Sequence, residues 1–242
     1  MLVNQEKCTG CGLCIPYCPA QAIKLINRKA HIDQEECLEC GTCGRLRIVK
    51  CPQQALYENP AVFKRPRSIR KYFSDPMATH VETKVPGRGT EEVKTNDVTG
   101  RVTRGQVGIA IEVGRPSVAA SYRDVEKITM ALSRYQICYE EKNPLSHLMQ
   151  DVSQGTFTEE AKQARVVSAI IEFVIPESQL EEILSTLMQV AKEIDTVFSL
   201  DLIARFREDG SIPSFPQLGQ IGIQPRPNAK INLGMGRPIK EE

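Results

Sequence analysis

The sequence predicts an α+β protein with a small cysteine-rich N-terminal module and a larger domain of mixed strands and helices. Two observations lead to this prediction. Eight of the nine cysteines fall within the first 51 residues, whereas later residues alternate between short apolar strands and amphipathic helices. A chain of 242 residues, 41% hydrophobic and 25% charged, suffices for one large or two small domains. We divide the chain into residues 1–60, 61–104, 105–210 and 211–242.

The eight N-terminal cysteines form two similar runs. Each run begins with three cysteines at C-x2-C-x2-C spacing and ends with a cysteine directly before proline. The first run has the bacterial iron-sulfur spacing C-x2-C-x2-C-x3-C-P, and the second has seven residues before its last cysteine. Three closely spaced thiolates on a glycine-containing loop can wrap one corner of an iron-sulfur cube. The sequence therefore predicts two [4Fe-4S] clusters, with the ligands Cys8, Cys11, Cys14, Cys18, Cys37, Cys40, Cys43 and Cys51.

Two other uses of eight cysteines fit the sequence less well. A disulfide framework suits small secreted chains, but the first seven residues lack the basic region and apolar run of a signal peptide. Zinc sites usually combine two separated C-x2-C pairs, whereas three thiolates are bunched here. Iron-sulfur binding is the interpretation we favour, and it implies a reducing, oxygen-poor compartment.

Residues 1–60 resemble the bacterial two-cluster ferredoxins at all eight cysteines and at both following prolines, Pro19 and Pro52. In that family the fourth ligand of each cluster comes from the other run. The resemblance therefore implies two ligand sets, the first being Cys8, Cys11, Cys14 and Cys51, and the second Cys37, Cys40, Cys43 and Cys18. It also implies low-potential electron transfer. The seven residues 44–50 replace three residues of the shortest family members.

Four short strands are expected in this module, at residues 2–3, 23–26, 30–32 and 55–57. A helical turn is expected to open at each Cys-Pro proline. We expect Tyr17, between two ligands, to pack over a cluster and exclude water. Because so small a module buries little apolar surface, cluster binding is expected to supply most of its folding free energy.

Residues 61–104 are expected to form a basic, extended connector. Five cations precede the first acid, Asp75, and they are Lys64, Arg65, Arg67, Arg70 and Lys71. They could be solvated, lie across the acidic face of the cluster module, or guide a docking partner. The later segment 87–92 lacks the endings of known phosphate-binding loops. No nucleotide or flavin motif occurs in the chain, which argues against a self-contained reductase that uses NAD or FAD.

Residues 105–210 predict an α+β sandwich. Strands are expected at 107–113, 137–139, 166–175 and 196–206, with helices after the capping Ser121 and from Pro176, and an irregular stretch from 144 to 160. We expect Ala191 to face the core. This order matches the split β-α-β, ferredoxin-like pattern of a four-stranded antiparallel sheet with two helices on one face. The element order alone also resembles amino-acid-sensing modules of the ACT type.

Three smaller features remain. Segments 114–116 and 236–238 both read Gly-Arg-Pro. Arg115 and Arg237 could clamp an anion, but we favour two similar strand ends in glycine turns, the second in a Pro/Gly-rich arm at 211–242. We expect Cys138 to be a buried small apolar residue. No catalytic set can be recognised, and no role is assigned to the three histidines.

We therefore predict a cytoplasmic electron-transfer protein or subunit, a non-catalytic component that passes single electrons to or from a partner oxidoreductase. The alternative is a redox-linked regulatory module that binds a small anion. Two loaded clusters, each with a formal charge of about −2, turn the formal net charge of +1 negative, which disfavours nucleic acid as a partner. No apolar run is long enough to span a membrane. The C-terminal domain is the candidate for oligomerisation or complex formation.

Overall fold

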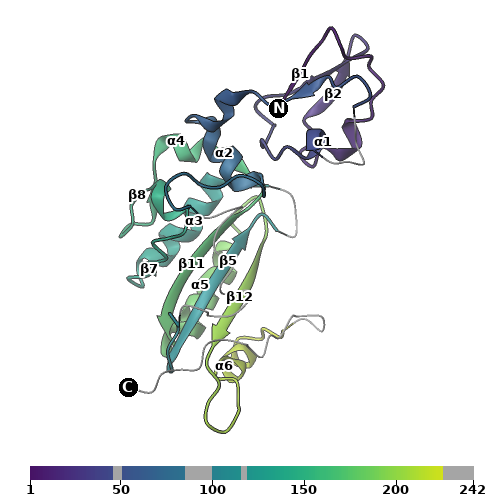
Figure 1. Ribbon diagram of the computed structural model, residues 1–242. Coiled ribbons are helices and arrows are strands. Elements are labelled where there is room, and N and C mark those ends of the chain that lie inside the picture. The colour runs from purple at the N-terminus through teal and green to yellow at the C-terminus, as the bar shows by residue number, and fades with distance from the viewer. Residues whose placement is uncertain (46–50, 85–99, 116–118, 226–242) are drawn as a thin grey trace.

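The computed structural model describes residues 1–45, 51–84, 100–115 and 119–225. A small module that holds strands β1 to β4 lies at one end of the molecule, and a larger domain of sheet and helices lies at the other (Figure 1). Helices and strands are mixed along the chain, which confirms the α+β class.

The N-terminal module contains two antiparallel strand pairs. β1 (Leu2–Val3) pairs with β4 (Leu56–Tyr57), and β2 (Ile23–Ile26) pairs with β3 (Lys29–Ile32). All four strands lie in or directly beside the segments in which the sequence predicts strands. Because β1 and β4 come from the two ends of the module, their pairing closes it. Its buried core is small and consists of Met1, Cys8, Ala22, Ile23, Ala30, Cys37, Cys43 and Ala55.

The prediction of helical turns that begin at Pro19 and Pro52 is wrong, because both prolines begin simple turns. Each turn contains a glutamine with positive φ, Gln21 at 51° and Gln54 at 49°, and this left-handed conformation prevents a helix from continuing. The helical segments of the module precede the prolines instead, namely η1 (Ile15–Tyr17) and α1 (Thr42–Arg45).

The prediction of an extended connector over residues 61–104 is also wrong for the first part of this segment. Residues 60–74 form η2 (Pro60–Phe63) and α2 (Arg67–Ser74). Ile69 and Phe73, four residues apart on one side of α2, are buried in the core of the larger domain. Segment 87–92, which lacks the endings of known phosphate-binding loops, lies outside the described residues.

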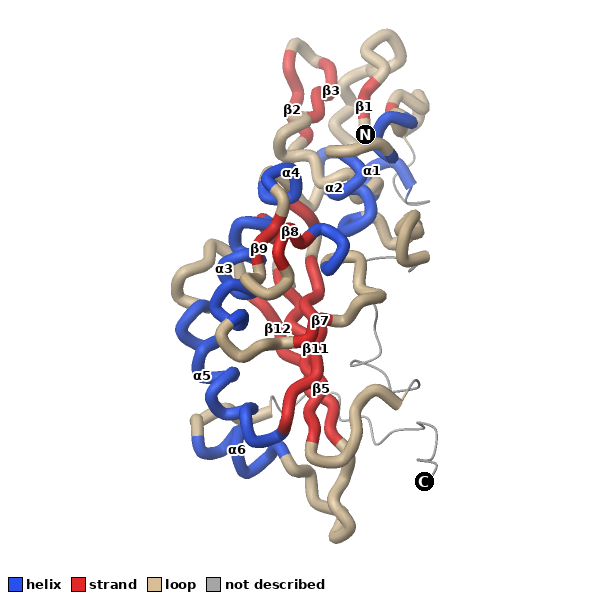
Figure 2. The backbone as a smooth tube through the Cα atoms, turned by 90° about the vertical axis from the view of Figure 1, so that its left-hand side faces the viewer, coloured by secondary structure: helices blue, strands red, loops and turns tan. Residues whose placement is uncertain are grey.

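The larger domain is built on a four-stranded antiparallel sheet in the order β12-β5-β11-β7. Its strands are β5 (Gln106–Val113), β7 (Cys138–Tyr139), β11 (Ala169–Pro176) and β12 (Phe198–Ala204). Helices α3 (Tyr122–Ser133) and α5 (Leu180–Val190) cover the same face of this sheet (Figure 2). The hydroxyl of Ser121 accepts a hydrogen bond from the amide of Asp124 and caps α3 as expected.

Residues 144–160 contain more structure than the sequence indicates. The additional elements around and after this stretch are β6 (Ala120–Ser121), η3 (Ser146–Leu148), β8 (Met149–Asp151), β9 (Thr156–Phe157), α4 (Glu159–Lys162), β10 (Arg165–Val166), η4 (Glu177–Gln179) and α6 (Ser214–Gln220). The strand expected at 166–175 is divided into β10 and β11. The α5 helix begins after η4 and ends at Val190, so Ala191 is exposed and its expected core position is wrong.

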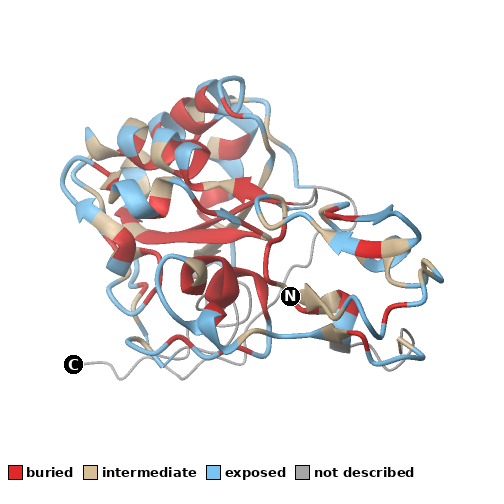
Figure 3. Ribbon diagram, turned by 90° about the horizontal axis from the view of Figure 1, so that it is seen from above, coloured by how far each residue is buried: buried red, intermediate tan, exposed pale blue. Residues whose placement is uncertain are grey.

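Helix α6 changes the boundary of the domain. Leu218 on α6 is buried in the same core as Leu184 and Leu187 of α5, so the domain extends beyond residue 210. The expected C-terminal arm is therefore wrong for residues 214–220, while residues 226–242 lie outside the described part. Buried residues concentrate in the sheet and the inner sides of the helices, and they are sparse in the N-terminal module (Figure 3).

Candidate iron-sulfur centres

The two cysteine runs repeat the same backbone arrangement. The amide of Cys8 donates to the carbonyl of Asn4 at 3.0 Å, and the amide of Cys37 donates to the carbonyl of Asp33 at 2.9 Å. Each run then passes through a left-handed glycine, Gly12 at φ 74° and Gly41 at φ 68°. The cysteine loops are therefore two copies of one local structure.

The fourth cysteine of each run also has a repeated environment. The amide of Ala22 donates to Sγ of Cys18 at 3.2 Å, and the amide of Ala55 donates to Sγ of Cys51 at 3.3 Å. Backbone donors that point at a sulfur atom offset its negative charge when it serves as an iron ligand.

Two small cavities each bring four of the cysteines together. Apolar side chains of Val3, Leu13, Ala30, Ala55 and Leu56 share the first cavity with Cys8, Cys11, Cys14 and Cys51, the first quartet. Met1, Ile23, Ile32 and Leu38 share the second with Cys18, Cys37, Cys40 and Cys43, the second quartet. These are the two sets that the ferredoxin resemblance implies. The role of the eight cysteines as ligands stays a prediction.

The pKa shifts of the cysteines follow the same grouping. Burial raises the pKa of the Cys14 thiol, and repulsion from the other three members of the first quartet raises it further, against a backbone hydrogen bond that lowers it. Burial raises the pKa of Cys43 to about 12, again with repulsion from the other three members of its quartet. Four thiolates in each cavity therefore need strong positive charge, which an iron-sulfur core supplies.

Within the described ranges, no three His, Cys, Asp or Glu side chains stand close enough together to hold a single metal ion. The four sulfurs of each quartet instead surround a cavity with mostly apolar walls and amide donors. This donor set fits a compact cluster with four thiolate ligands.

The two quartets differ in exposure. Cys11 of the first quartet is exposed, whereas Cys37 and Cys43 of the second are buried. Beside the first quartet, Leu13 and Leu25 keep 52% and 44% of their surfaces exposed. The first quartet is therefore the more accessible of the two.

Helix α2 covers the loop of the second quartet. Arg67 donates to the carbonyl of Gln34 at 2.6 Å and forms an ion pair with Glu39. Arg70 donates to the carbonyls of Glu35 at 2.5 Å and Cys37 at 3.1 Å. Of the alternatives for the basic stretch, the structure favours contact with the cluster module for these two arginines.

Glu39 is a functional candidate that the sequence analysis missed. It is 1% exposed, lies between two cysteines of the second quartet, and has a positive φ of 56°. Burial alone would raise its pKa, but hydrogen bonds from the Met1 ammonium group and from Arg67 outweigh burial and hold the pKa below its ordinary value. The only sequence signal was its position, where the first run has Gly10.

Two expected side-chain placements are wrong. Tyr17 is 37% exposed and is not among the described residues that line either cavity. Cys138 is exposed, because it pairs with Val174 on the sheet face that points away from the core, whereas its neighbour Tyr139 pairs with Phe173 on the core face. Arg115 forms an ion pair with Glu112 at 3.1 Å, while Arg237, its proposed partner in a clamp, lies outside the described residues.

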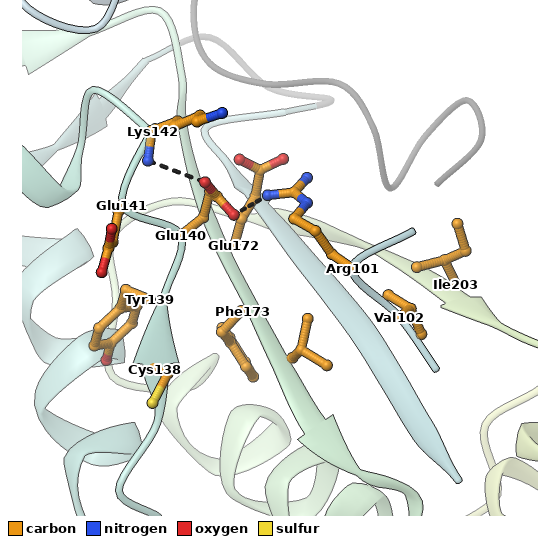
Figure 4. A pocket seen from close by; sticks show the side chains of 11 residues that line it. Arg101, Val102, Cys138, Tyr139, Glu140, Glu141, Lys142, Glu172, Phe173 and Ile203 are labelled. Carbon is orange, nitrogen blue, oxygen red and sulfur yellow. Dashed lines mark hydrogen bonds and ion pairs between the residues drawn. The ribbon is translucent and has the colours of Figure 1, made fainter. Parts of the chain in front are cut away.

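The larger domain has a cavity of its own, of about 310 Å³, beside β7 and β11. Arg101, Glu140 and Glu172 project into it, with Cys138 and Phe173 along its wall (Figure 4). Arg101 forms an ion pair with Glu140, and Glu172 accepts a hydrogen bond from Asn143 at 2.6 Å. Sequence reasoning gave no indication of this cavity, because its walls come from four separate segments.

Comparison with known proteins supports the class of the N-terminal module. Residues 1–24 match the family model of the 4Fe-4S binding domain. The module is therefore a ferredoxin-type domain, and this match supports binding of a [4Fe-4S] cluster.

A curated relative points to the same chemistry. Over 54 residues, the chain is 45% identical to a component of the ion-translocating oxidoreductase complex of Methanosarcina acetivorans. The match covers 22% of this chain and 19% of that component, so the chain spans about a fifth of its length. No solved structure matches the chain. Among the described residues, no helix is both long and apolar enough to cross a lipid bilayer.

Proposed function

We propose that this protein is an electron-transfer component that carries single low-potential electrons through two [4Fe-4S] clusters to or from a partner oxidoreductase. The observation that carries the proposal is the presence of two cavities, each lined by four cysteines from both runs. When bound, each cluster supplies a site that can gain and lose one electron. The relative from Methanosarcina acetivorans is part of an oxidoreductase complex, which supports a partner of this kind.

The protein residues hold and insulate the clusters in this proposal. The cysteines of each quartet bind iron, the amides of Ala22 and Ala55 stabilise thiolate charge, and the apolar walls restrict water. The first quartet, the more accessible of the two, is the end at which a redox partner docks, because electron exchange needs a short distance between centres.

The test is anaerobic reconstitution of the full chain with iron and sulfide. About eight irons and eight sulfides per chain are expected, together with two reversible one-electron centres. Cys138→Ser is the matched control, because Cys138 is an exposed cysteine in the other domain, and it should leave the iron content unchanged. Zinc in place of iron, or electron transfer that survives the loss of quartet cysteines, would contradict the proposal.

We further propose that β5, α3, β7, β11, α5 and β12 form a split β-α-β unit that docks or dimerises. The strand order β12-β5-β11-β7 and the two helices on one face support it. Analytical ultracentrifugation of the loaded chain, alone and with its redox partner, tests this role.

The cavity in the larger domain favours a second candidate function, the binding of a small ligand that couples to redox state. Three carboxylates and two cations line the cavity, namely Glu140, Glu141, Glu172, Arg101 and Lys142. This balance favours a ligand with an amino group over a simple anion. Calorimetric titration of the loaded chain with amino acids and with inorganic phosphate distinguishes the two, and heat from neither would count against this candidate.

A further inference from the structure

The two cysteine loops present equivalent backbone carbonyls to different cations. In the first loop, Lys29 donates to the carbonyls of Gln5 at 2.9 Å and Cys8 at 2.5 Å. The repeat places Gln34 and Cys37 at the corresponding positions of the second loop. Arg70 of α2 donates hydrogen bonds to the carbonyls of Gln34 at 3.2 Å and Cys37 at 3.1 Å.

The two cations, Lys29 and Arg70, come from different parts of the protein, so the two halves of the module are held differently. Lys29 belongs to β3 and is part of the module itself. Arg70 belongs to α2, whose other side lies in the core of the larger domain. The Phe73 ring lies edge-on to the Tyr122 ring at 5.6 Å, and the amide of Val167 donates to the hydroxyl of Ser74 at 3.0 Å. The second loop is therefore attached to the larger domain through α2.

The charge of Arg70 is poorly screened. The residue is 8% exposed, and its carboxylate partner Glu35, 3.7 Å away, has a side chain that is 88% exposed. Water screens that carboxylate more than it screens the guanidinium group. Arg67 shares its carboxylate partner, Glu39, with the ammonium group of Met1. Arg70 thus places a buried positive charge against the second loop, and the carboxylate partner of that charge is exposed to water.

We propose that Arg70 is a positioning residue through which the larger domain holds the second quartet and raises the reduction potential of the cluster bound there. A reduced cluster carries one more negative charge than an oxidised one, so a buried cation beside Cys37 favours the reduced form. This inference rests on the proposed function, because it requires a cluster in each quartet.

The test is a redox titration of the anaerobically loaded full chain, followed by electron paramagnetic resonance. Arg70→Gln keeps hydrogen-bond donors but removes the charge, and it should lower the equilibrium constant for reduction of one centre about tenfold, or about 59 mV for one electron. Arg70→Lys keeps the charge and should retain the wild-type potential. Lys29→Gln is the matched control from the repeat, and it should change the other centre.

Glu35→Gln gives an independent test at an exposed position that does not threaten folding. Removal of its charge should raise the potential of the centre that Arg70→Gln lowers, by a smaller amount than the Arg70→Gln shift because water screens this carboxylate. Glu6→Gln, at the corresponding position of the first loop, should leave that centre unchanged.

Two kinds of failure can be separated. A chain that binds no iron-sulfur cluster would overturn the proposed function. A chain with about eight irons, in which Arg70→Gln and Glu35→Gln leave both potentials unchanged or shift both centres equally, would overturn this inference alone. If Arg70→Gln prevents cluster loading, the Glu35→Gln variant is the test of this inference. In that case, an unchanged potential at both centres of Glu35→Gln would overturn the inference.

Discussion

The proposed ligand exchange between the two cysteine runs predicts which pairs of substitutions affect the same cluster. Cys11 and Cys51 line one cavity, whereas Cys18 lines the other. The double variant Cys11→Ala, Cys51→Ala therefore removes two ligands from one centre. The double variant Cys11→Ala, Cys18→Ala removes one ligand from each centre, although it loses the same number of cysteines.

The expected magnitudes follow from this placement. With four irons in each cluster, the loaded chain holds about eight. The variant that loses Cys11 and Cys51 should keep about four irons and one reducible centre. The variant that loses Cys11 and Cys18 should hold close to none, because each centre is left with three thiolates.

The assay combines iron and sulfide determination per chain with electron paramagnetic resonance of the reduced protein, after identical anaerobic reconstitution of both variants. Each double variant is compared with a single variant, Cys51→Ala for the first and Cys18→Ala for the second. In the proposed arrangement, Cys51→Ala leaves the same residual spectrum as Cys11→Ala, whereas Cys18→Ala leaves the other. The opposite assignment would refute ligand exchange and show that each run completes its own cluster.

Three further predictions concern stability and reactivity. Removal of the clusters should unfold residues 1–57, because the module has so small an apolar core; circular dichroism and limited proteolysis measure this, and a protease-resistant apo module would contradict it. Phe73→Ala should lower the free energy of unfolding of the larger domain by about 3 to 5 kcal/mol, since the ring is 1% exposed; denaturant titration measures it, and exposed Phe63→Ala is its control. Cys138 should react with a thiol reagent in the loaded chain while the quartets stay protected, so mass spectrometry should find one adduct at that residue rather than several.

The parts of the fold that could be predicted depend on local patterns. The alternating apolar residues of 107–113 and the capping Ser121 identified β5 and the start of α3, because each pattern follows from backbone geometry. The grouping of the cysteines came from the resemblance to two-cluster ferredoxins, which have the same motif. Its regular spacing reflects the size and shape of the cluster that the loop would surround.

The parts that could not be predicted depend on contacts between distant residues. The charges of α2 conceal a short apolar side, and burial of Ile69 becomes evident only when the larger domain is in place. The carbonyl of Gln34 that accepts from Arg67 lies 33 positions earlier in the chain. Cys138 has apolar neighbours in sequence, but its exposure depends on the register of β7 against β11, which turns the thiol to the sheet face away from the core. Local composition contains no information about such positions.

The attachment of α2 has a thermodynamic consequence for the larger domain. If the charge of Arg70 favours the reduced state of the second centre, reduction must favour the docked position of α2 by the same free energy. Lys29 cannot transmit this effect, because it lies within the module whose carbonyls it contacts. Arg70 can, because Phe73 on the same helix is packed in the other domain. The two proposed centres are therefore alike in their ligand spacing and backbone but differ in their connections. Among the described residues, α2 links the second loop to the core of the larger domain, so reduction of the second centre would act on that domain through Arg70.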